Sequence, residues 1–324
     1  VIISAGFSER DGQAGIDRQR ELQQFAAEHG IYICGPNCLG VANLKDKVQA
    51  NSGSGIDRLI PELGPIGVVS QSGATAFGPI IAKAKDRGAR LKYIVSTGNE
   101  VNLESADFMR YMLDDPEVRV IAAFVEGFKD GEKIQAVADL ALRRKKPIVL
   151  MKMGRSEVGG RAALTHTAAI TGSFDVHQGF FRQKGIVRVD DYDELCEVAN
   201  LFSKEKFPRG DRVGIISHSG GICTFLSDEC ADAGFLVPQL SEETTVTING
   251  ILQGWGSCEN PLDLTGFVQG PDFPKILLTV INDPNVDSVI VATRGNREFA
   301  AKIIQAARDT DKPLLFVWTH SEFD

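Results

Sequence analysis

Continuous apolar runs that alternate with helical patterns are the feature that most constrains this chain. Four such runs, each followed by a stretch of helical periodicity, are Ile66–Val69, Tyr93–Ser96, Val120–Val125 and Pro147–Met151. Strands that are apolar throughout and separated by helices are typical of a parallel sheet with both faces covered. The sequence therefore predicts an α/β fold built on a doubly wound sheet, in which ligands bind beyond the carboxyl ends of the strands.

The same pattern starts again in the second half of the chain. Val213–Gly220 repeats Ile66–Gly73, with Ser-His-Ser-Gly where the first copy has Ser-Gln-Ser-Gly. The Asp-Pro-x-Val and Lys-Pro motifs of the first copy recur at Asp283 and Lys312. The spacings agree if the second copy carries an insertion of about twenty residues near 241–265. We therefore expect two tandem doubly wound, flavodoxin-like domains.

A shorter unit precedes these two domains. A helix at Gly15–His29 lies between apolar strands at Val1–Gly6 and Ile31–Cys34, which is one strand–helix–strand unit and too small for a domain. It is interpreted as the tail of a Rossmann-like domain, so that the chain is expected to be a fragment of something longer. The predicted domain ranges are 1–42, 43–207 and 208–324.

Composition excludes several classes of protein. The net charge of −8 argues against a nucleic-acid-binding surface. No apolar run has the length of a membrane span and no stretch resembles a signal peptide. The cysteine usage leads us to expect a reduced, cytoplasmic protein. The six cysteines do not form a disulfide framework pattern, and Cys34 and Cys38 lack a second ligand pair for zinc. No metal ligand is therefore assigned.

Two turns at strand ends are candidate anion sites. Ser70, Ser72 and Gly73 lie between a buried strand and a helix, where backbone N–H groups can receive a phosphoryl group or a carboxylate. The same residue types also cap helices, and the pattern alone does not decide between the two roles. Asn37 and Cys38 belong to a second such turn. Neither turn matches a Walker A loop or a G-x-G-x-x-G fingerprint.

A loop rich in glycine and alanine, residues 153–173, follows the strand at Pro147–Met151 and carries His166 at its centre. Loops of this length in compact domains are usually functional or disordered, and a lone histidine in one is most often simply solvated. Glu126 ends a neighbouring strand. Its carboxylate could accept a hydrogen bond from one nitrogen of His166, which would leave the other nitrogen free to attack. A solvated glutamate is the competing interpretation. His218, the counterpart of Gln71, is expected to be structural or peripheral.

Taken in order, seven motifs resemble those of the NDP-forming acyl-CoA synthetases, the superfamily that includes succinyl-CoA synthetase. The motifs are Gly35–Gly40, Val69–Gly73, Thr97–Glu100, Glu126–Gly127, Lys152–Ser156, Thr165–Thr167 and Asn260–Gly266. The resemblance covers essentially the whole chain. It is specific for the superfamily and leaves the carboxylic acid, the choice of ATP or GTP and the oligomeric state open.

The resemblance implies an acid–CoA ligase that converts a carboxylic acid, CoA and ATP into acyl-CoA, ADP and phosphate. Acyl phosphate and phosphohistidine would be the intermediates, with His166 as the phosphorylated residue and Glu126 as the carboxylate that orients it. Asn37, Cys38, Ser70, Ser72 and Gly73 would line the acyl and phosphate site. Residues 1–42 would be the end of a CoA-binding domain. ATP and Mg²⁺ would serve the complete enzyme.

Two departures from the family pattern bear on this expectation. Ala168 stands where the family usually has glycine, which is tolerable if φ there is negative. By the resemblance, we also expect that most of the CoA-binding domain and any ATP-grasp nucleotide domain lie outside this chain. An ATP-grasp domain or subunit is therefore an expected partner, and an oligomer is expected. The alternative function is a non-catalytic module that binds CoA or acyl-CoA, and a flavodoxin-like nucleotide-binding scaffold is a third.

Overall fold

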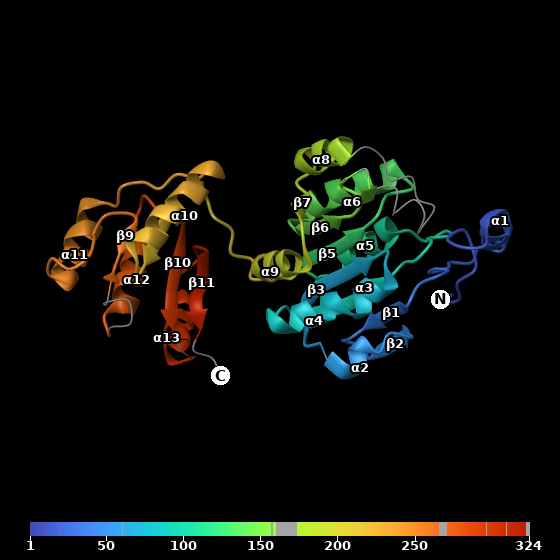
Figure 1. The fold of residues 1–324 in the computed structure, drawn as a ribbon, viewed down its shortest axis with the longest axis horizontal. Coiled ribbons are helices and arrows are strands. Elements are labelled where there is room, and N and C mark those ends of the chain that lie inside the picture. Colours follow the sequence, from blue (N-terminus) through green and yellow to red (C-terminus); the bar gives the residue numbers. More distant parts are fainter. Residues whose placement is uncertain are drawn as a thin grey trace. The chain divides into compact units, whose positions relative to one another are not determined.

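The computed structural model describes residues 1–59, 61–156, 158–159, 174–265, 271–295, 297–308 and 310–321. The chain forms two compact units, Val1–Glu205 and Lys206–Asp324, and each has its own sheet (Figure 1). His166 and most of its loop lie outside the described residues.

The first unit contains a seven-stranded sheet with the order β2-β1-β4-β3-β5-β6-β7. Five strands, from β4 to β7 in this order, are parallel, and their order is that of a flavodoxin-like sheet. The strands are β1 (Gly40–Asn43), β2 (Val48–Asn51), β3 (Leu63–Ser70), β4 (Leu91–Ser96), β5 (Val120–Val125), β6 (Ile148–Lys152) and β7 (Val187–Val189).

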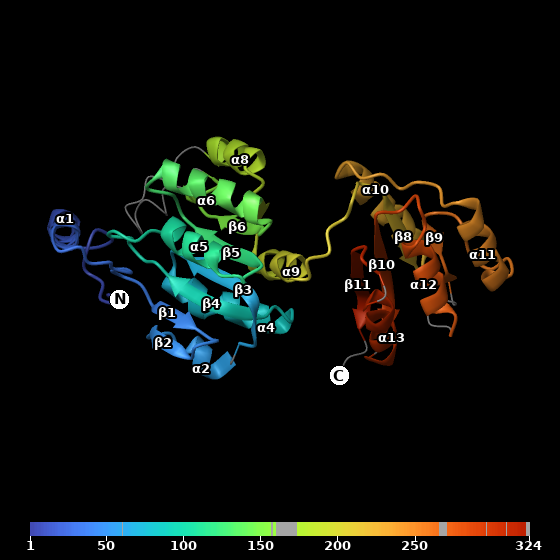
Figure 2. The same ribbon diagram turned by 180° about the vertical axis from the view of Figure 1, so that it is seen from behind.

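Helices cover both faces of this sheet, as the views from opposite sides show (Figures 1 and 2). One apolar core lies between the strands and α3, α4 and α9, and the other lies between the strands and α5, α6 and α8. Adjacent residues of β3 serve the two cores, because Val68 faces the first and Val69 the second. The helices of the unit are α1 (Gly12–Glu28), α2 (Gly55–Leu59), α3 (Gly73–Phe77), α4 (Pro79–Asp86), α5 (Ser105–Asp114), α6 (Gly131–Arg144), α8 (Phe174–Gln183) and α9 (Tyr192–Phe202).

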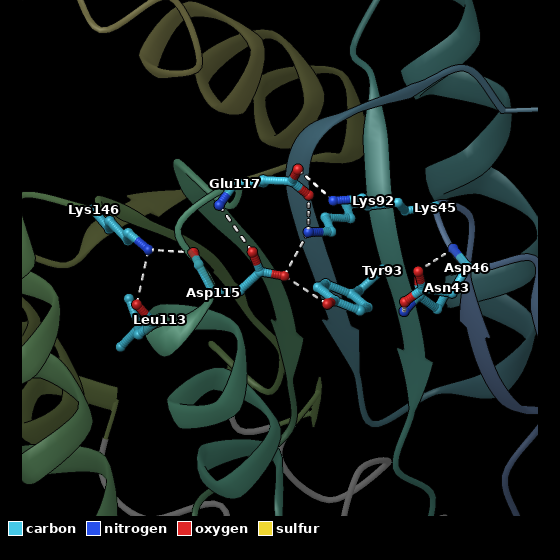
Figure 3. Close-up of polar contacts among 9 residues, drawn as sticks. All are labelled: Asn43, Lys45, Asp46, Lys92, Tyr93, Leu113, Asp115, Glu117 and Lys146. Atoms are coloured by element: carbon cyan, nitrogen blue, oxygen red, sulfur yellow. Dashed lines mark hydrogen bonds and ion pairs between the residues drawn. The ribbon is translucent and has the colours of Figure 1, made fainter.

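A buried ion pair ties the strand β4 to the turn before β5 (Figure 3). Lys92, whose side chain is 5% exposed, lies 2.6 Å from Asp115 and 2.5 Å from Glu117. Tyr93 donates a hydrogen bond of 2.6 Å to Asp115. Burial raises the pKa of Asp115, but the hydrogen bonds from Lys92 and Tyr93 outweigh burial and lower that pKa to about 2. Lys45, just after β1, also pairs with Glu117, so the cluster reaches the β1–β2 hairpin.

The second unit has a four-stranded sheet with the order β11-β10-β8-β9. Its described strand pairs are all parallel, and the order again follows the flavodoxin-like pattern. Its elements are β8 (Val213–Ser217), α10 (Gly220–Asp232), α11 (Glu242–Leu252), β9 (Leu262–Asp263), α12 (Phe273–Ile281), β10 (Ser288–Gly295), α13 (Arg297–Arg308) and β11 (Leu314–Ser321).

The repeat read from the sequence corresponds to equivalent contacts in the two units. Lys146 donates to the carbonyl oxygens of Leu113 and Asp115, at 2.8 and 2.6 Å. Lys312 donates to those of Asp283 and Val286, at 2.8 and 2.6 Å. In each unit the lysine before a strand therefore holds the Asp-Pro turn before the neighbouring strand. The prediction of two α/β sheets of flavodoxin type is confirmed.

The N-terminal part differs from the prediction. The helix predicted at Gly15–His29 is present as α1, but no strand forms at Val1–Gly6 or Ile31–Cys34. The two segments share a hydrogen bond from Ile2 N to Cys34 O, while Gly35 O and Ile33 O accept from the backbone after Thr97–Glu100. The second segment is thus held by that loop instead of by a strand ladder.

Residues 43–63 contain part of a β-hairpin and a short helix. The hairpin strands β1 and β2 pair antiparallel, and β1 also pairs antiparallel with β4. The predicted division between residues 42 and 43 falls inside β1. The helical stretch after β3 is interrupted at Gly78, because Pro79 starts a new helix there. The three-domain division itself stays a prediction.

Within the described ranges, none of the helices is long and apolar enough to cross a membrane.

Candidate functional site

The candidate site lies where the order of the parallel strands reverses. The strand β3 lies between β4 and β5, and the register places Ser70 level with Ser96 and Phe124. The turns that follow β3, β4 and β5 therefore meet at one edge of the sheet. At this position the connections that leave neighbouring strands run in opposite directions. Such switch points are the ligand-binding positions of open α/β sheets.

The side chain of Gln71 joins two of these turns. Its Oε1 accepts hydrogen bonds from the backbone N–H groups of Glu126, at 2.5 Å, and Gly127, at 3.1 Å. Its Nε2 donates to the carbonyl oxygen of Gly127 at 2.7 Å and to the carboxylate of Glu100 at 3.1 Å. The amide, which follows β3, therefore links the turn after β4 to the turn after β5.

Glu126 has a buried carboxylate at the end of β5. The residue is 8% exposed, and its Oε2 has no hydrogen-bond partner among the residues that the structure describes. Lys152, at the end of the neighbouring β6, donates 2.7 Å to the backbone oxygen of Glu126 and 2.5 Å to that of Met153. Burial lowers the pKa of Lys152, and the charge of Glu126 opposes this effect. The backbone of Glu126 is thus held on both sides, while one carboxylate oxygen lacks a donor among the described residues.

The turn after β4 contributes a second buried carboxylate. Glu100 accepts from the Thr97 hydroxyl at 2.8 Å and the Ser105 N–H at 2.8 Å, in addition to Gln71. Burial raises the pKa of Glu100, and these hydrogen bonds oppose the rise. Lys129 donates to the backbone oxygens of Asn99 and Glu100, at 2.5 and 2.9 Å. Burial lowers the pKa of Lys129.

The turn with Asn37 packs directly against these residues. Asn37 adopts a positive φ of 54° and donates 3.2 Å to the side-chain oxygen of Asn99. Gly98 has no room for a side chain, since a Cβ there would lie 2.2 Å from the carbonyl oxygen of Pro36. The predicted turn with Asn37 therefore joins the others at this edge.

Cys38 turns its side chain away into the interior. It is 2% exposed, and its thiol donates 3.4 Å to the backbone oxygen of Ile2. The neighbouring thiol of Cys34 lowers the pKa of the Cys38 thiol below its usual value, although burial acts in the opposite direction. The contribution of Cys38 to ligand binding stays a prediction.

Both hydroxyls of the Ser70–Gly73 turn are used within the turn. Ser70 is fully buried and donates 2.7 Å to the carbonyl oxygen of Ser72. Ser72 accepts from the N–H of Thr75 at 3.4 Å and is the N-cap of α3. A Cβ at Gly73 would lie 2.6 Å from Cγ of Leu39. Glycine at this position therefore allows close contact with the turn that contains Asn37. The capping role is present, and the anion-binding role stays a prediction.

The structure brings Asn37, Ser70, Ser72, Gly73 and Glu126 to one edge, whereas His166 lies outside the described residues. The sequence reasoning assigned no role to Gln71, Glu100, Lys129 or Lys152. Three of these were within quoted motifs, and their positions at strand ends were the available signal. In the part of the chain that the structure describes, no three His, Cys, Asp or Glu side chains gather to hold a metal ion.

The fold and site thus define a flavodoxin-like α/β protein with a buried carboxylate at the switch point of its sheet, one oxygen of which has no partner among the described residues. Comparisons with known proteins agree. Residues 63–202 match the family model of the succinyl-CoA ligase like flavodoxin domain. The chain is 33% identical to subunit alpha of acetate–CoA ligase [ADP-forming] II of Pyrococcus furiosus. The match covers 97% of this chain and 69% of that subunit.

Two further relatives extend this result. The 4-hydroxybutyrate–CoA ligase [ADP-forming] of Nitrosopumilus maritimus is 32% identical over 97% of the chain, which covers 45% of that enzyme. A solved acetyl-coenzyme A synthetase 1 of Ca. Korarchaeum cryptofilum, in complex with phosphate and ADP, superimposes with a TM-score of 0.85 at 27% identity. That match covers 97% of this chain and 68% of the other.

The chain belongs to the NDP-forming acyl-CoA synthetase family, as the resemblance of its motifs predicted. The named relatives are ADP-forming acid–CoA ligases, enzymes that form a thioester bond. The chain spans about two thirds of the Pyrococcus subunit and less than half of the Nitrosopumilus enzyme.

Proposed function

We propose that this chain is the part of an ADP-forming acid–CoA ligase that handles the acyl group and relays the phosphoryl group through His166. The observation that carries the proposal is the buried Oε2 of Glu126, which lacks a donor among the described residues. A buried polar atom without a partner is costly in free energy, so such atoms usually have a function or a partner that arrives. The ring N–H of His166 is that donor.

The proposed chemistry uses the two nitrogens of the His166 ring. The nitrogen that donates to Glu126 is fixed as N–H, which leaves the lone pair of the other nitrogen free to take the phosphoryl group from ATP. Transfer of this group to the carboxylate of the acid gives the acyl phosphate. The CoA sulfur then attacks the acyl carbon, and phosphate leaves. Asn37, Ser70, Ser72 and Gly73 line the position where the acyl phosphate forms.

The remaining substrates are assigned by family membership. CoA and a nucleotide are required by the named reaction, and residues 1–42 are proposed to be the end of the CoA-binding domain. ATP and Mg²⁺ are proposed to serve the complete enzyme. An ATP-grasp domain or subunit is the proposed partner. The relative named subunit alpha supports an enzyme of more than one subunit. A cytoplasmic oligomer is proposed.

The decisive experiment is phosphorylation of the complete polypeptide, together with its nucleotide-binding partner, by ATP and Mg²⁺. Intact mass should show the gain of one acid-labile phosphate in the wild type, and ADP should remove it. The gain should be absent in His166→Ala and strongly reduced in Glu126→Gln. Glu104→Gln is the matched control, because Glu104 is a partly buried carboxylate that pairs with Lys133 away from Glu126.

The competing function is a non-catalytic module that binds CoA or acyl-CoA. It predicts binding of CoA without any phosphorylation when ATP is shown to bind. A phosphate that persists in His166→Ala would also contradict the relay. If the relay is established, turnover with a panel of short-chain, dicarboxylic and aromatic acids identifies the substrate.

A further inference from the structure

Gln71 is the residue whose contacts the proposed relay leaves unexplained. It follows β3, while its side chain makes three of its four hydrogen bonds to the backbone after β5. A glutamine amide can accept at its oxygen and donate at its nitrogen. Here the oxygen takes the N–H groups of Glu126 and Gly127, and the nitrogen gives one bond to Gly127 O and one to Glu100.

We propose that Gln71 is the positioning residue for the carboxylate of Glu126. The inference rests on the proposed function, because it concerns the carboxylate that would orient His166. Gln71 contacts the backbone on the N-terminal side of Glu126, and Lys152 contacts its carbonyl oxygen at 2.7 Å. The peptide units on both sides of Glu126 are therefore held by side chains at the ends of two other strands, which restricts where its carboxylate can point.

Glu100 anchors the other end of the Gln71 amide. Its two oxygens have separate partners, since Oε1 accepts from Thr97 and Ser105 while Oε2 accepts from Gln71. The buried carboxylate thus orients the amide so that its oxygen faces the N–H groups of Glu126 and Gly127. The turns after β3, β4 and β5 are coupled through one side chain.

This arrangement predicts that Gln71 acts only through Glu126. Gln71→Met has similar volume and removes all four hydrogen bonds. It should slow the single-turnover phosphorylation of His166 between about tenfold and a hundredfold, the range seen when a supporting shell or a reacting geometry is disturbed. The KM for ATP should stay at the wild-type value. Gln71→Asn is the milder variant, because it keeps the amide but shortens its reach.

A double-mutant cycle tests the coupling. In a Glu126→Gln background, Gln71→Met and Gln71→Asn should slow phosphorylation by less than about twofold, because the group that Gln71 positions is already lost. Asn102→Ala is the matched control. Asn102 also bridges two backbone groups with its amide, Ile33 N and Ile31 O, but does not contact residues 126 or 127. Its effect, whatever its size, should multiply with that of Glu126→Gln.

The outcomes separate this inference from the proposed function. Three results would overturn the positioning role while leaving the relay intact. They are a loss of phosphorylation rate that multiplies in full with that of Glu126→Gln, a change that only raises the KM for ATP, and a wild-type rate in both Gln71 variants. Absence of any phosphate on the wild type, or its persistence in His166→Ala, would overturn the relay itself. If Gln71→Met does not fold, the cycle with Gln71→Asn gives the same decision.

Discussion

The turns Ser70–Gly73 and Ser217–Gly220 have nearly the same sequence and the same place between a strand and a helix, yet their surroundings differ in charge. Register places Ser70 level with Phe124 and Ser217 level with Ala292. Two residues further along, the first unit has Glu126 and the second has Arg294. The same type of turn is therefore followed, on the adjacent strand, by an anionic residue in one unit and a cationic residue in the other.

The residue between the two serines also differs between the units, both in its type and in its hydrogen bonds. Gln71 is fully engaged with the neighbouring strand end, as described above. The Nδ1 atom of His218 is buried and has no hydrogen-bond partner within the described ranges. The comparison indicates that the shared turn fixes where a side chain lies, whereas the residues at the end of the adjacent strand determine what that side chain can bind. The expected peripheral role of His218 stays a prediction.

The largest predicted contrast comes from adding one methyl group to each turn. In Gly73→Ala the new Cβ would lie 2.6 Å from Cγ and 3.0 Å from N of Leu39, so the turn with Asn37 must move. We expect acyl-CoA formation to fall by about a hundredfold. In Gly220→Ala the nearest atom is a side-chain oxygen of Asp263 at 3.1 Å, which can rotate away. A rate within about threefold of wild type is expected there. Equal losses in steady-state rate would contradict the contrast.

A second contrast concerns the ion pairs of the two units. Lys92→Met leaves Asp115 without its buried cation, which should destabilise the first unit by about 3 kcal/mol. Arg212→Met breaks the pair with Asp287 in the second unit, where the arginine side chain is 38% exposed. The expected cost there is smaller, because water screens an ion pair whose cation is exposed. Hydrogen exchange followed by mass spectrometry reports each unit separately, and a larger loss of protection in Arg212→Met would reverse the ranking.

The smallest predicted effect is the acid response of the Asp115 cluster, shown in Figure 3. The pKa of Asp115 is about 2 in the folded chain and about 3.9 in an unfolded one, so the unfolded chain binds more protons in between. The stabilisation is complete above about pH 4 and is lost as the pH falls through about 2. The loss should amount to about 2 kcal/mol. Asp115→Asn should flatten this part of the stability profile of the first unit, and an unchanged slope would contradict the assignment.

The parallel strands were predictable because each is a continuous apolar run with a helix on either side. The hairpin strands were not, since all but one residue of β2 are exposed and its four residues form no apolar run. Their position depends on pairing with β4, which is remote in sequence. At Ile31–Cys34 a strand was predicted that does not form. An apolar run is necessary for a buried strand, but it does not supply the neighbouring strand with which a ladder forms.

The site was predictable to the same degree. Glu126 and the Ser70 turn could be found because strand ends are recognisable in the sequence, and parallel strands place those ends at one edge. The role of Gln71 could not, since its partners depend on β5 lying next to β3, and the strand order was not predicted. The relation of His166 to Glu126 stays a prediction, because the histidine is outside the described residues.

The order of the seven-stranded sheet also determines how this unit behaves beside other copies of itself. Its two borders are β2, with four residues, and β7, with three. Unpaired strand edges can recruit strands from other chains and so start aggregation, and short or charged edges reduce that danger. The border strand β2 is preceded by Lys45 and Lys47, and Lys47 has a positive φ of 56°. The long apolar strands are thus kept inside, and the sheet offers a second chain little backbone to extend.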